Sequence, residues 1–249
     1  KALKRFRFIT YAGLLLLLTG HGVMGQKSGS NPQTPETRIL FIFDGSQSMK
    51  GSWEGSRKIL IARDYLIHLV DSLKNQDRLE MALRVYGHQH EVPPQNCNDT
   101  RLEVPFSDNN AARIKQTLRQ IRPRGTTPIA RSLSKARKDF PPCQNCRNVI
   151  ILITDGKEAC EGDPCAVSKE LQKEGIILRP FIIGIGVDPS FHESFECAGD
   201  FHNAPNKNRF QNNLDVVITQ ALNTTTAQVN LLDTQGRPTE TNVAMTFYN

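Results

Sequence analysis

The chain has 249 residues and a formal net charge of +6. Four of its basic residues and none of its acidic residues lie within the first 25 positions, so the remainder is close to neutral. This balance argues against a nucleic-acid partner, which needs a basic surface. The length is enough for one domain with a sizeable core and a smaller additional segment.

Residues 1–25 have the pattern of a secretory signal peptide, with a basic head and an apolar core from Phe8 to Leu18. This core is shorter than the about 20 apolar residues that a membrane span needs, although an uncleaved anchor is the alternative. Residues 26–37 are rich in Ser, Gly, Asn and Pro, which predicts a flexible linker. We therefore expect a mature chain without a transmembrane segment that is secreted, periplasmic or located at the cell surface.

The first ordered segment is an apolar run from Ile39 to Phe43 that ends abruptly in polar residues. A run without polar alternation predicts a strand buried on both faces, which is typical of a parallel sheet covered by helices. Asp44, Ser46 and Ser48 follow it and offer three hard oxygen ligands at alternate positions. Because ligands bind beyond the carboxyl ends of such strands, the segment predicts a cation site.

Strands and helices alternate along the rest of the chain, which predicts a doubly wound α/β fold. Ser56 and Asp163 are the residues expected to cap the helices that follow them. The predicted strands cover residues 79–85, 104–106, 148–154 and 176–187, and the predicted helices cover residues 57–74, 109–121, 129–140, 164–175 and 212–222.

The pattern changes beyond residue 223. Residues 224–249 resemble a β-hairpin without the sheet it would need, because an isolated hairpin is only marginally stable. We interpret them as the truncated start of a β-rich domain, similar to a β-sandwich or immunoglobulin-like domain.

Two further segments place oxygen-bearing side chains at comparable points of this alternation. Gly125-Thr126-Thr127-Pro128 precedes a predicted helix, and Thr154-Asp155-Gly156 follows a second buried strand. In this order along the chain, and together with Asp44-x-Ser46-x-Ser48, they resemble the von Willebrand factor A domain with its metal-ion-dependent adhesion site. The resemblance assigns residues 38–223 to this domain. It implies a mostly parallel six-stranded sheet flanked by helices.

The same resemblance implies a role for each residue of the site. Ser46, Ser48 and Thr127 would bind the metal directly, whereas Asp44 and Asp155 would act partly through water. Two carboxylates and three hydroxyls form an all-oxygen site suited to Mg²⁺, with Mn²⁺ or Ca²⁺ as alternatives. An acidic side chain of a protein partner would complete the coordination, which is how the family typically binds proteins. The alternative for the Asp and Ser residues is a purely conformational turn.

Several arginines surround the Thr127 segment in the sequence. They would either attract an acidic ligand towards the metal or form an ordinary solvated helix face. These residues are Arg119, Arg122, Arg124 and Arg131.

All six cysteines lie beyond the predicted signal peptide, and an even number in an exported chain predicts disulfides. We expect a local bridge between Cys143 and Cys146. The alternatives are a redox pair or one half of a zinc site completed by His88 and His90. We favour the disulfide over these alternatives and expect His88 and His90 to lie in an exposed loop.

The other four cysteines, Cys97, Cys160, Cys165 and Cys197, allow three pairings. The insert from Cys160 to Cys165 resembles that of exported bacterial members of the family. The family's strand order would separate the strands near Cys97 and Cys197 by roughly four spacings of about 4.8 Å, which a disulfide cannot bridge. The resemblance therefore implies that Cys160 and Cys165 each form a disulfide with one of the other two cysteines, one on each side of the sheet.

The first functional hypothesis is an exported, non-enzymatic adhesion or interaction module that grips a protein ligand through a divalent cation. The second is a structural subunit of a cell-surface or secreted assembly, in which the metal only stabilises the fold. A metal-dependent hydrolase would need a general base beside the metal. His88 and Glu158 are the only candidates for that base, so we expect no enzymatic activity.

Overall fold

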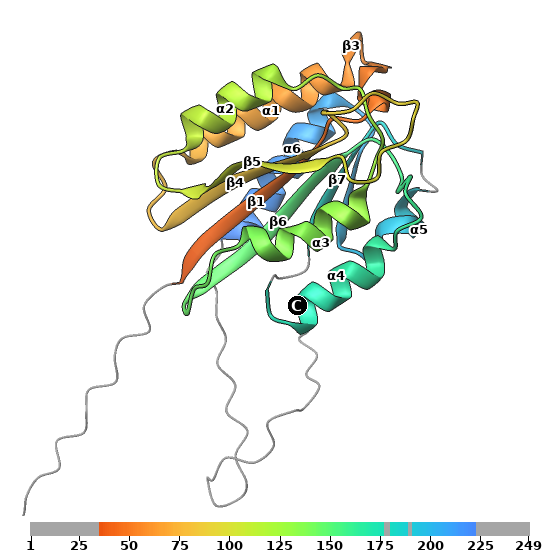
Figure 1. Ribbon diagram of the computed structural model, residues 1–249. Helices are drawn as coiled ribbons and strands as arrows, with labels where there is room; N and C mark the ends of the chain where they lie inside the picture. The colour runs from red at the N-terminus through yellow and green to blue at the C-terminus, as the bar shows by residue number, and fades with distance from the viewer. Residues whose placement is uncertain (1–34, 177–179, 189–190, 223–249) are drawn as a thin grey trace, which may run out of the picture. The chain divides into compact units, whose positions relative to one another are not determined.

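The computed structural model describes residues 35–176, 180–188 and 191–222. Its centre is a six-stranded sheet with the strand order β5-β4-β1-β6-β7-β8 (Figure 1). Neighbouring strands are parallel except for β5, which runs antiparallel to β4. This arrangement confirms the predicted doubly wound α/β fold. The strands of this sheet are β1 (Glu36–Asp44), β4 (Leu79–Tyr86), β5 (Thr100–Ser107), β6 (Cys146–Thr154), β7 (Phe181–Ile185) and β8 (Asp200–Ala204).

Helices cover both faces of the sheet. The strand β1 is fully buried between them, because Ile39, Phe41 and Phe43 pack on one face and Leu40 and Ile42 on the other. The first face is covered by α1, α2 and α6, and the second by α3, α4 and α5. The helices are α1 (Lys58–Leu73), α2 (Ala111–Gln120), α3 (Ile129–Asp139), α4 (Pro164–Lys173), α5 (Phe191–Phe195) and α6 (Lys207–Leu222).

The segment that connects β1 to α1 contains three short elements. These are the 3-10 helix η1 (Gln47–Lys50) and two short antiparallel strands, β2 (Ser52–Trp53) and β3 (Ser56–Arg57). Ser56 was predicted to cap α1, but it pairs in β3 and the helix begins after Arg57, whose side chain makes no capping bond. In contrast, the predicted cap of α4 is confirmed, because Asp163 accepts hydrogen bonds from two backbone N–H groups of the first turn.

Other element boundaries differ from the prediction, mainly at the edges of the sheet. The domain begins two residues earlier than expected, since Glu36 and Thr37 belong to β1 and not to the linker. Both edge strands carry many polar residues, which hides them from a search for apolar runs. The prediction therefore included only residues 104–106 of β5 and did not include β8. The prediction also did not include the helix α5. The helix α6 begins before residue 212, where the predicted helix starts, and β7 is shorter than the strand predicted for residues 176–187.

A buried ion pair fastens α3 to the sheet. The Arg84 guanidinium in β4 donates to both carboxylate oxygens of Asp139 at the end of α3, over 2.6 and 2.7 Å. Both side chains are only 6% exposed. Such a bidentate pair fixes orientation as well as distance. It therefore holds the carboxyl end of α3 against β4.

The predicted signal peptide, most of the linker and the β-rich segment at 224–249 lie outside the described residues. Among the residues that the structure describes, no helix is long and apolar enough to cross a membrane.

Candidate metal centre

The two predicted carboxylates meet at one edge of the sheet. Asp44 is the last residue of β1, and Asp155 follows the last residue of the adjacent parallel strand β6. The two residues touch, because the Asp155 backbone N–H lies 3.4 Å from Asp44 Oδ2. Thr154 also donates its hydroxyl to this oxygen over 2.8 Å. The parallel pairing of β1 and β6 thus places both acids at a single point.

The loop after β1 folds the two serines towards these carboxylates. Asp44 Oδ1 accepts a hydrogen bond from the Ser46 backbone N–H over 2.7 Å, which closes a turn of the Asx type. The Ser46 and Ser48 hydroxyl oxygens lie 2.9 Å apart, and Ser48 donates to Asp155 Oδ1 over 2.6 Å. A chain of polar contacts therefore runs from one carboxylate to the other through both hydroxyls.

Thr127 reaches the same point from the loop before α3. This loop is held to the first one by a bridge between Ser46 and Gly125 and by the Gln47 N–H, which donates to the Gly125 carbonyl over 2.8 Å. A Cβ atom built on Gly156 would lie 3.7 Å from the hydroxyl oxygens of both Ser48 and Thr127. These two hydroxyls consequently face one small space above the glycine, and the structure brings all five predicted ligands together.

The electrostatics of this group suit a cation. Burial, together with the negative charge of Asp155, raises the pKa of Asp44 to about 6. Asp155 Oδ2 is buried and has no hydrogen-bond donor among the described residues, although the Lys58 ammonium forms an ion pair with it at 3.0 Å. Two carboxylates balance a divalent ion, and all the available donors are hard oxygens. The residues present therefore fit Mg²⁺, Mn²⁺ or Ca²⁺.

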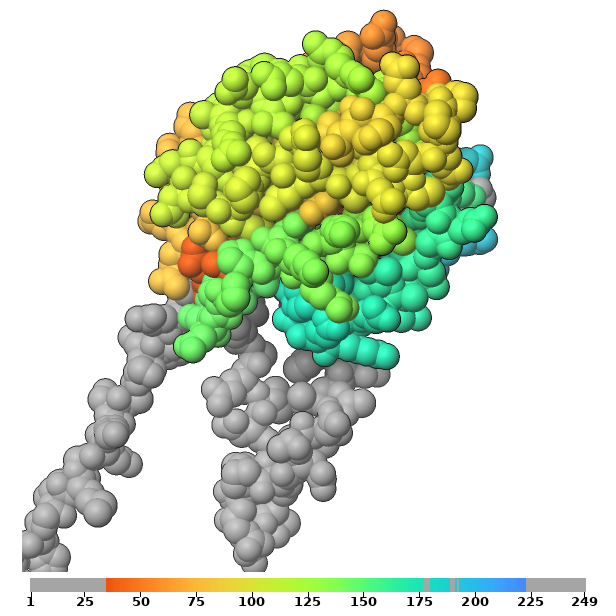
Figure 2. All heavy atoms as spheres, viewed as in Figure 1, coloured from red at the N-terminus to blue at the C-terminus, as the bar shows by residue number. Residues whose placement is uncertain are grey.

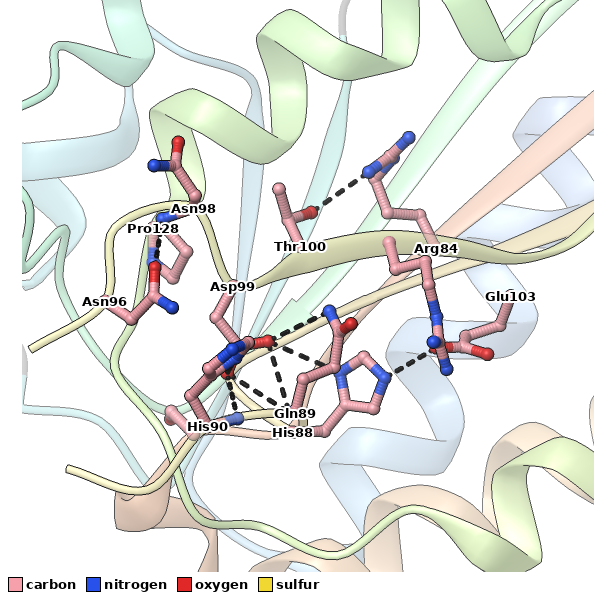
Figure 3. Close-up of polar contacts among 12 residues, drawn as sticks. Arg84, His88, Gln89, His90, Asn96, Asn98, Asp99, Thr100, Glu103 and Pro128 are labelled. Carbon is pink, nitrogen blue, oxygen red and sulfur yellow. Dashed lines mark hydrogen bonds and ion pairs between the residues drawn. The ribbon is translucent and has the colours of Figure 1, made fainter.

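Sequence reasoning missed Asp99, which anchors the loop after β4 (Figure 3). Its carboxylate is 1% exposed and accepts hydrogen bonds from the backbone N–H groups of Gln89 and His90. A Cβ atom on Gly125 would lie 2.7 Å from Asp99 Oδ2, so only glycine fits there. Asp99 thereby packs the loop after β4 against the Thr127 loop. Nothing in its local sequence distinguishes it from an ordinary loop aspartate.

The two histidines of this loop differ in their surroundings. His90 is exposed as predicted, but the prediction was wrong for His88, whose side chain is only 7% exposed. His88 Nε2 lies 2.6 Å from Glu103 Oε1 (Figure 3). Burial alone would raise the pKa of Glu103, but the hydrogen bonds from His88 and Arg101 outweigh it and lower this pKa to about 2. The loop folds back on β5, which removes His88 from solvent.

Three disulfides include all six cysteines, as expected. The local bridge joins Cys143 and Cys146. The other two bridges, Cys97 to Cys160 and Cys165 to Cys197, tie the segment after Asp155 to the regions on both sides of it. Among the described residues, no group of three or more His, Cys, Asp or Glu side chains forms a further metal site.

Comparison with known proteins gives the family. The von Willebrand factor type A domain matches residues 39–213. The protein YwmD of Bacillus subtilis (strain 168), described as uncharacterised, is 30% identical over 210 residues, which cover 80% of this chain and 92% of YwmD.

Solved structures agree on the fold. BatB from Bacteroides thetaiotaomicron has a TM-score of 0.60 and 18% identity, over 74% of this chain and 98% of BatB. Proximal thread matrix protein 1 from the mussel byssus, with a zinc-occupied metal-ion-dependent adhesion site, has a TM-score of 0.60 and 20% identity, over 76% of this chain and 46% of its own. Since the family match extends from the first strand into the last helix, the chain belongs to the von Willebrand factor type A domain family.

Proposed function

We propose that this domain is a divalent-cation-dependent protein-binding module that acts outside the cytoplasm. The observation that carries the proposal is the convergence of two carboxylates and three hydroxyls at the carboxyl ends of β1 and β6. The residues that would hold the ion are Asp44, Ser46, Ser48, Thr127 and Asp155. A divalent cation bound there would offer a coordination position to a carboxylate of the partner protein. Domains of this family mediate protein interactions, which supports the proposal.

The donor set favours Mg²⁺, because its ligands are oxygens only and few in number. Zinc occupies the corresponding motif of the mussel byssus protein, so Zn²⁺ belongs in the same titration. The three disulfides support the proposed location, since such bridges persist in oxidising compartments.

A binding role is favoured over a metal that only stabilises the fold. The loops of the site are already joined by protein contacts: Ser48 links Ser46 to Asp155, and Lys58 balances part of the charge. Because the protein's own contacts join these loops, a bound cation would not be their only link, and it could hold an external ligand.

A hydrolytic role is not part of the proposal, for a geometric reason. The two candidate bases are already engaged in structural hydrogen bonds. Glu158 accepts from the backbone N–H of Ala130 over 2.6 Å and from that of Cys160 over 2.8 Å. His88 is bonded to Glu103. A general base must reach the reacting proton, and both side chains are held by these other partners.

The proposal is tested with Mn²⁺ as a spectroscopic substitute for Mg²⁺. We expect the electron paramagnetic resonance spectrum of the bound ion to change when a short peptide with one glutamate is added. A matched peptide with glutamine should have no effect. Ser48→Ala should weaken both metal and peptide binding, whereas the matched control Gln47→Ala should leave both unchanged, because the Gln47 side chain is exposed. Metal binding without any response to the carboxylate would contradict the proposal.

A further inference from the structure

A cavity of about 440 Å³ lies at the surface of the domain. Its walls come from three separate segments: the stretch from η1 to the start of α1, the loop after β4, and the loop between α2 and α3. In Figures 1 and 2, the orange segment with β3 and the yellow segment after β4 lie side by side at the surface. The cavity is open to solvent and so to a ligand from outside.

The cavity is strongly basic. Four cationic side chains line it, Lys50, Arg57, Arg122 and Arg124, against the single carboxylate of Glu91. Within the described part of the chain, no carboxylate forms an ion pair with any of the four. The four positive charges thus exceed the one negative charge of the cavity, and the excess is available to an anionic ligand.

The four arginines that surround Thr127 in the sequence lie in different places in the structure. Arg122 and Arg124 line this cavity, whereas Arg131 lines a different one beside the Cys97 to Cys160 bridge. Arg119 lines neither of them, and its carbonyl oxygen accepts a hydrogen bond from Arg122. Only two of the four therefore contribute to a common basic site.

The cavity and the metal centre are built from neighbouring parts of the same loops. Lys50 ends the same 3-10 helix that contains Ser48. The Arg124 backbone N–H donates to the carbonyl oxygen of Gly45, inside the first metal loop, over 3.1 Å. Arg57 directly precedes Lys58, whose ammonium pairs with Asp155. The loops that carry the candidate metal ligands therefore also carry, or directly contact, residues that line the cavity.

We propose that this cavity binds a second acidic side chain of the same protein ligand, so that the partner presents an acidic peptide segment with at least two carboxylates. This inference rests on the proposed function and specifies its ligand. The buried side chain of Ile59 lines the cavity and suits the methylene groups of a glutamate. The carboxylate of Glu91 disfavours a dense polyanion such as polyphosphate, because like charges repel.

The test uses two fluorescein-labelled peptides of equal length, one of six glutamates and one with a single glutamate among Gly and Ser. Fluorescence anisotropy is measured with Mg²⁺ and with EDTA. We expect the six-glutamate peptide to bind roughly tenfold more tightly to the wild type, which corresponds to two or more favourable charge contacts. The double variant Arg122→Gln/Arg124→Gln should lose this advantage, while its affinity for the single-glutamate peptide changes less than about twofold.

The control is Lys169→Gln/Lys173→Gln, which removes the same charge from exposed positions of α4, on the other face of the sheet. It should leave both affinities unchanged, and an equal loss in this control would overturn the inference. If the cavity variant keeps the tighter, Mg²⁺-dependent binding of the six-glutamate peptide, the cavity is not part of the site but the proposed function stands.

Other outcomes separate the two proposals further. Six-glutamate binding that persists in EDTA but is lost in the cavity variant would support the cavity and contradict the metal-dependent function. Absence of binding to the wild type would overturn both. Tighter binding of polyphosphate than of the six-glutamate peptide, dependent on Arg122 and Arg124, would overturn the acidic peptide as the ligand. Circular dichroism of each variant verifies that it is folded.

Discussion

Replacing Lys58 by methionine should have opposite effects on the stability of the protein and on its affinity for metal. Lys58 is the first residue of α1, and its ammonium lies 3.0 Å from Asp155 Oδ2. The Lys58 side chain is 17% exposed and that of Asp155 is 0% exposed. The lysine is therefore the internal countercharge of a buried carboxylate that a bound cation would also neutralise.

The magnitudes follow from this geometry. Removing one partner of a buried ion pair costs about 3–5 kcal/mol, and the partial exposure of Lys58 reduces the expected loss of metal-free stability to roughly 2 kcal/mol. The missing positive charge also removes its repulsion of a divalent ion. At the effective dielectric of about 20 that applies near a protein surface, a unit charge about 10 Å from a divalent ion repels it by about 3 kcal/mol, so metal affinity should rise at least tenfold.

The assay combines urea unfolding in EDTA with calorimetric titration of Mg²⁺. The control is Lys74→Met at the other end of α1, where the lysine forms only an exposed pair with Asp71. This control should change neither the metal-free stability nor the affinity for Mg²⁺. A Lys58→Met protein with unchanged metal-free stability and unchanged or weaker Mg²⁺ binding would refute the role of Lys58 as the countercharge.

Three further predictions concern the scaffold of the site. Asp139→Asn leaves the buried guanidinium of Arg84 without its charge partner and should lower the free energy of unfolding by about 3–5 kcal/mol in urea titrations, whereas an unchanged midpoint would contradict the anchoring of α3. Because the pKa of Glu103 is lowered to about 2, its contribution to stability is present above pH 4.5 and is lost as the pH falls from 4.5 towards 2. The difference in melting temperature between the wild type and Glu103→Gln should therefore shrink over this range, and a difference independent of pH would be inconsistent with it. Replacing Cys97 and Cys160 by serine opens a bridge with a sequence separation of 63 and should cost about 4 kcal/mol of stability by the chain-entropy relation. Equal urea midpoints for the oxidised wild type and the double variant would contradict this.

The candidate metal centre could be predicted because three segments with weak individual signals occur in one order, and this order resembles the von Willebrand factor A domain, which supplied the roles of Ser46, Ser48 and Thr127. Asp44 and Asp155 each terminate a continuous apolar run, and such runs form the buried central strands of a parallel sheet. Parallel strands bring their carboxyl ends to one edge. The meeting of these two carboxylates therefore follows once β1 and β6 are neighbours, without knowledge of side-chain packing.

The surroundings of the site could not be predicted in this way, because they depend on contacts between distant segments. Asp99 becomes a buried support only when the loop after β4 folds against Gly125. Lys58 meets Asp155 only through the approach of α1 to the end of β6. The edge strand β8 is polar, so it lacks the apolar run that identifies the central strands.

The most direct test of the central claim is anomalous diffraction from crystals of the protein grown with Mn²⁺. The account predicts one strong anomalous peak within coordination distance of the Ser46, Ser48 and Thr127 hydroxyls, with Asp44 and Asp155 beside it. A peak elsewhere in the domain, or no peak at a Mn²⁺ concentration that saturates binding in solution, would contradict the claim that these five residues hold a divalent cation.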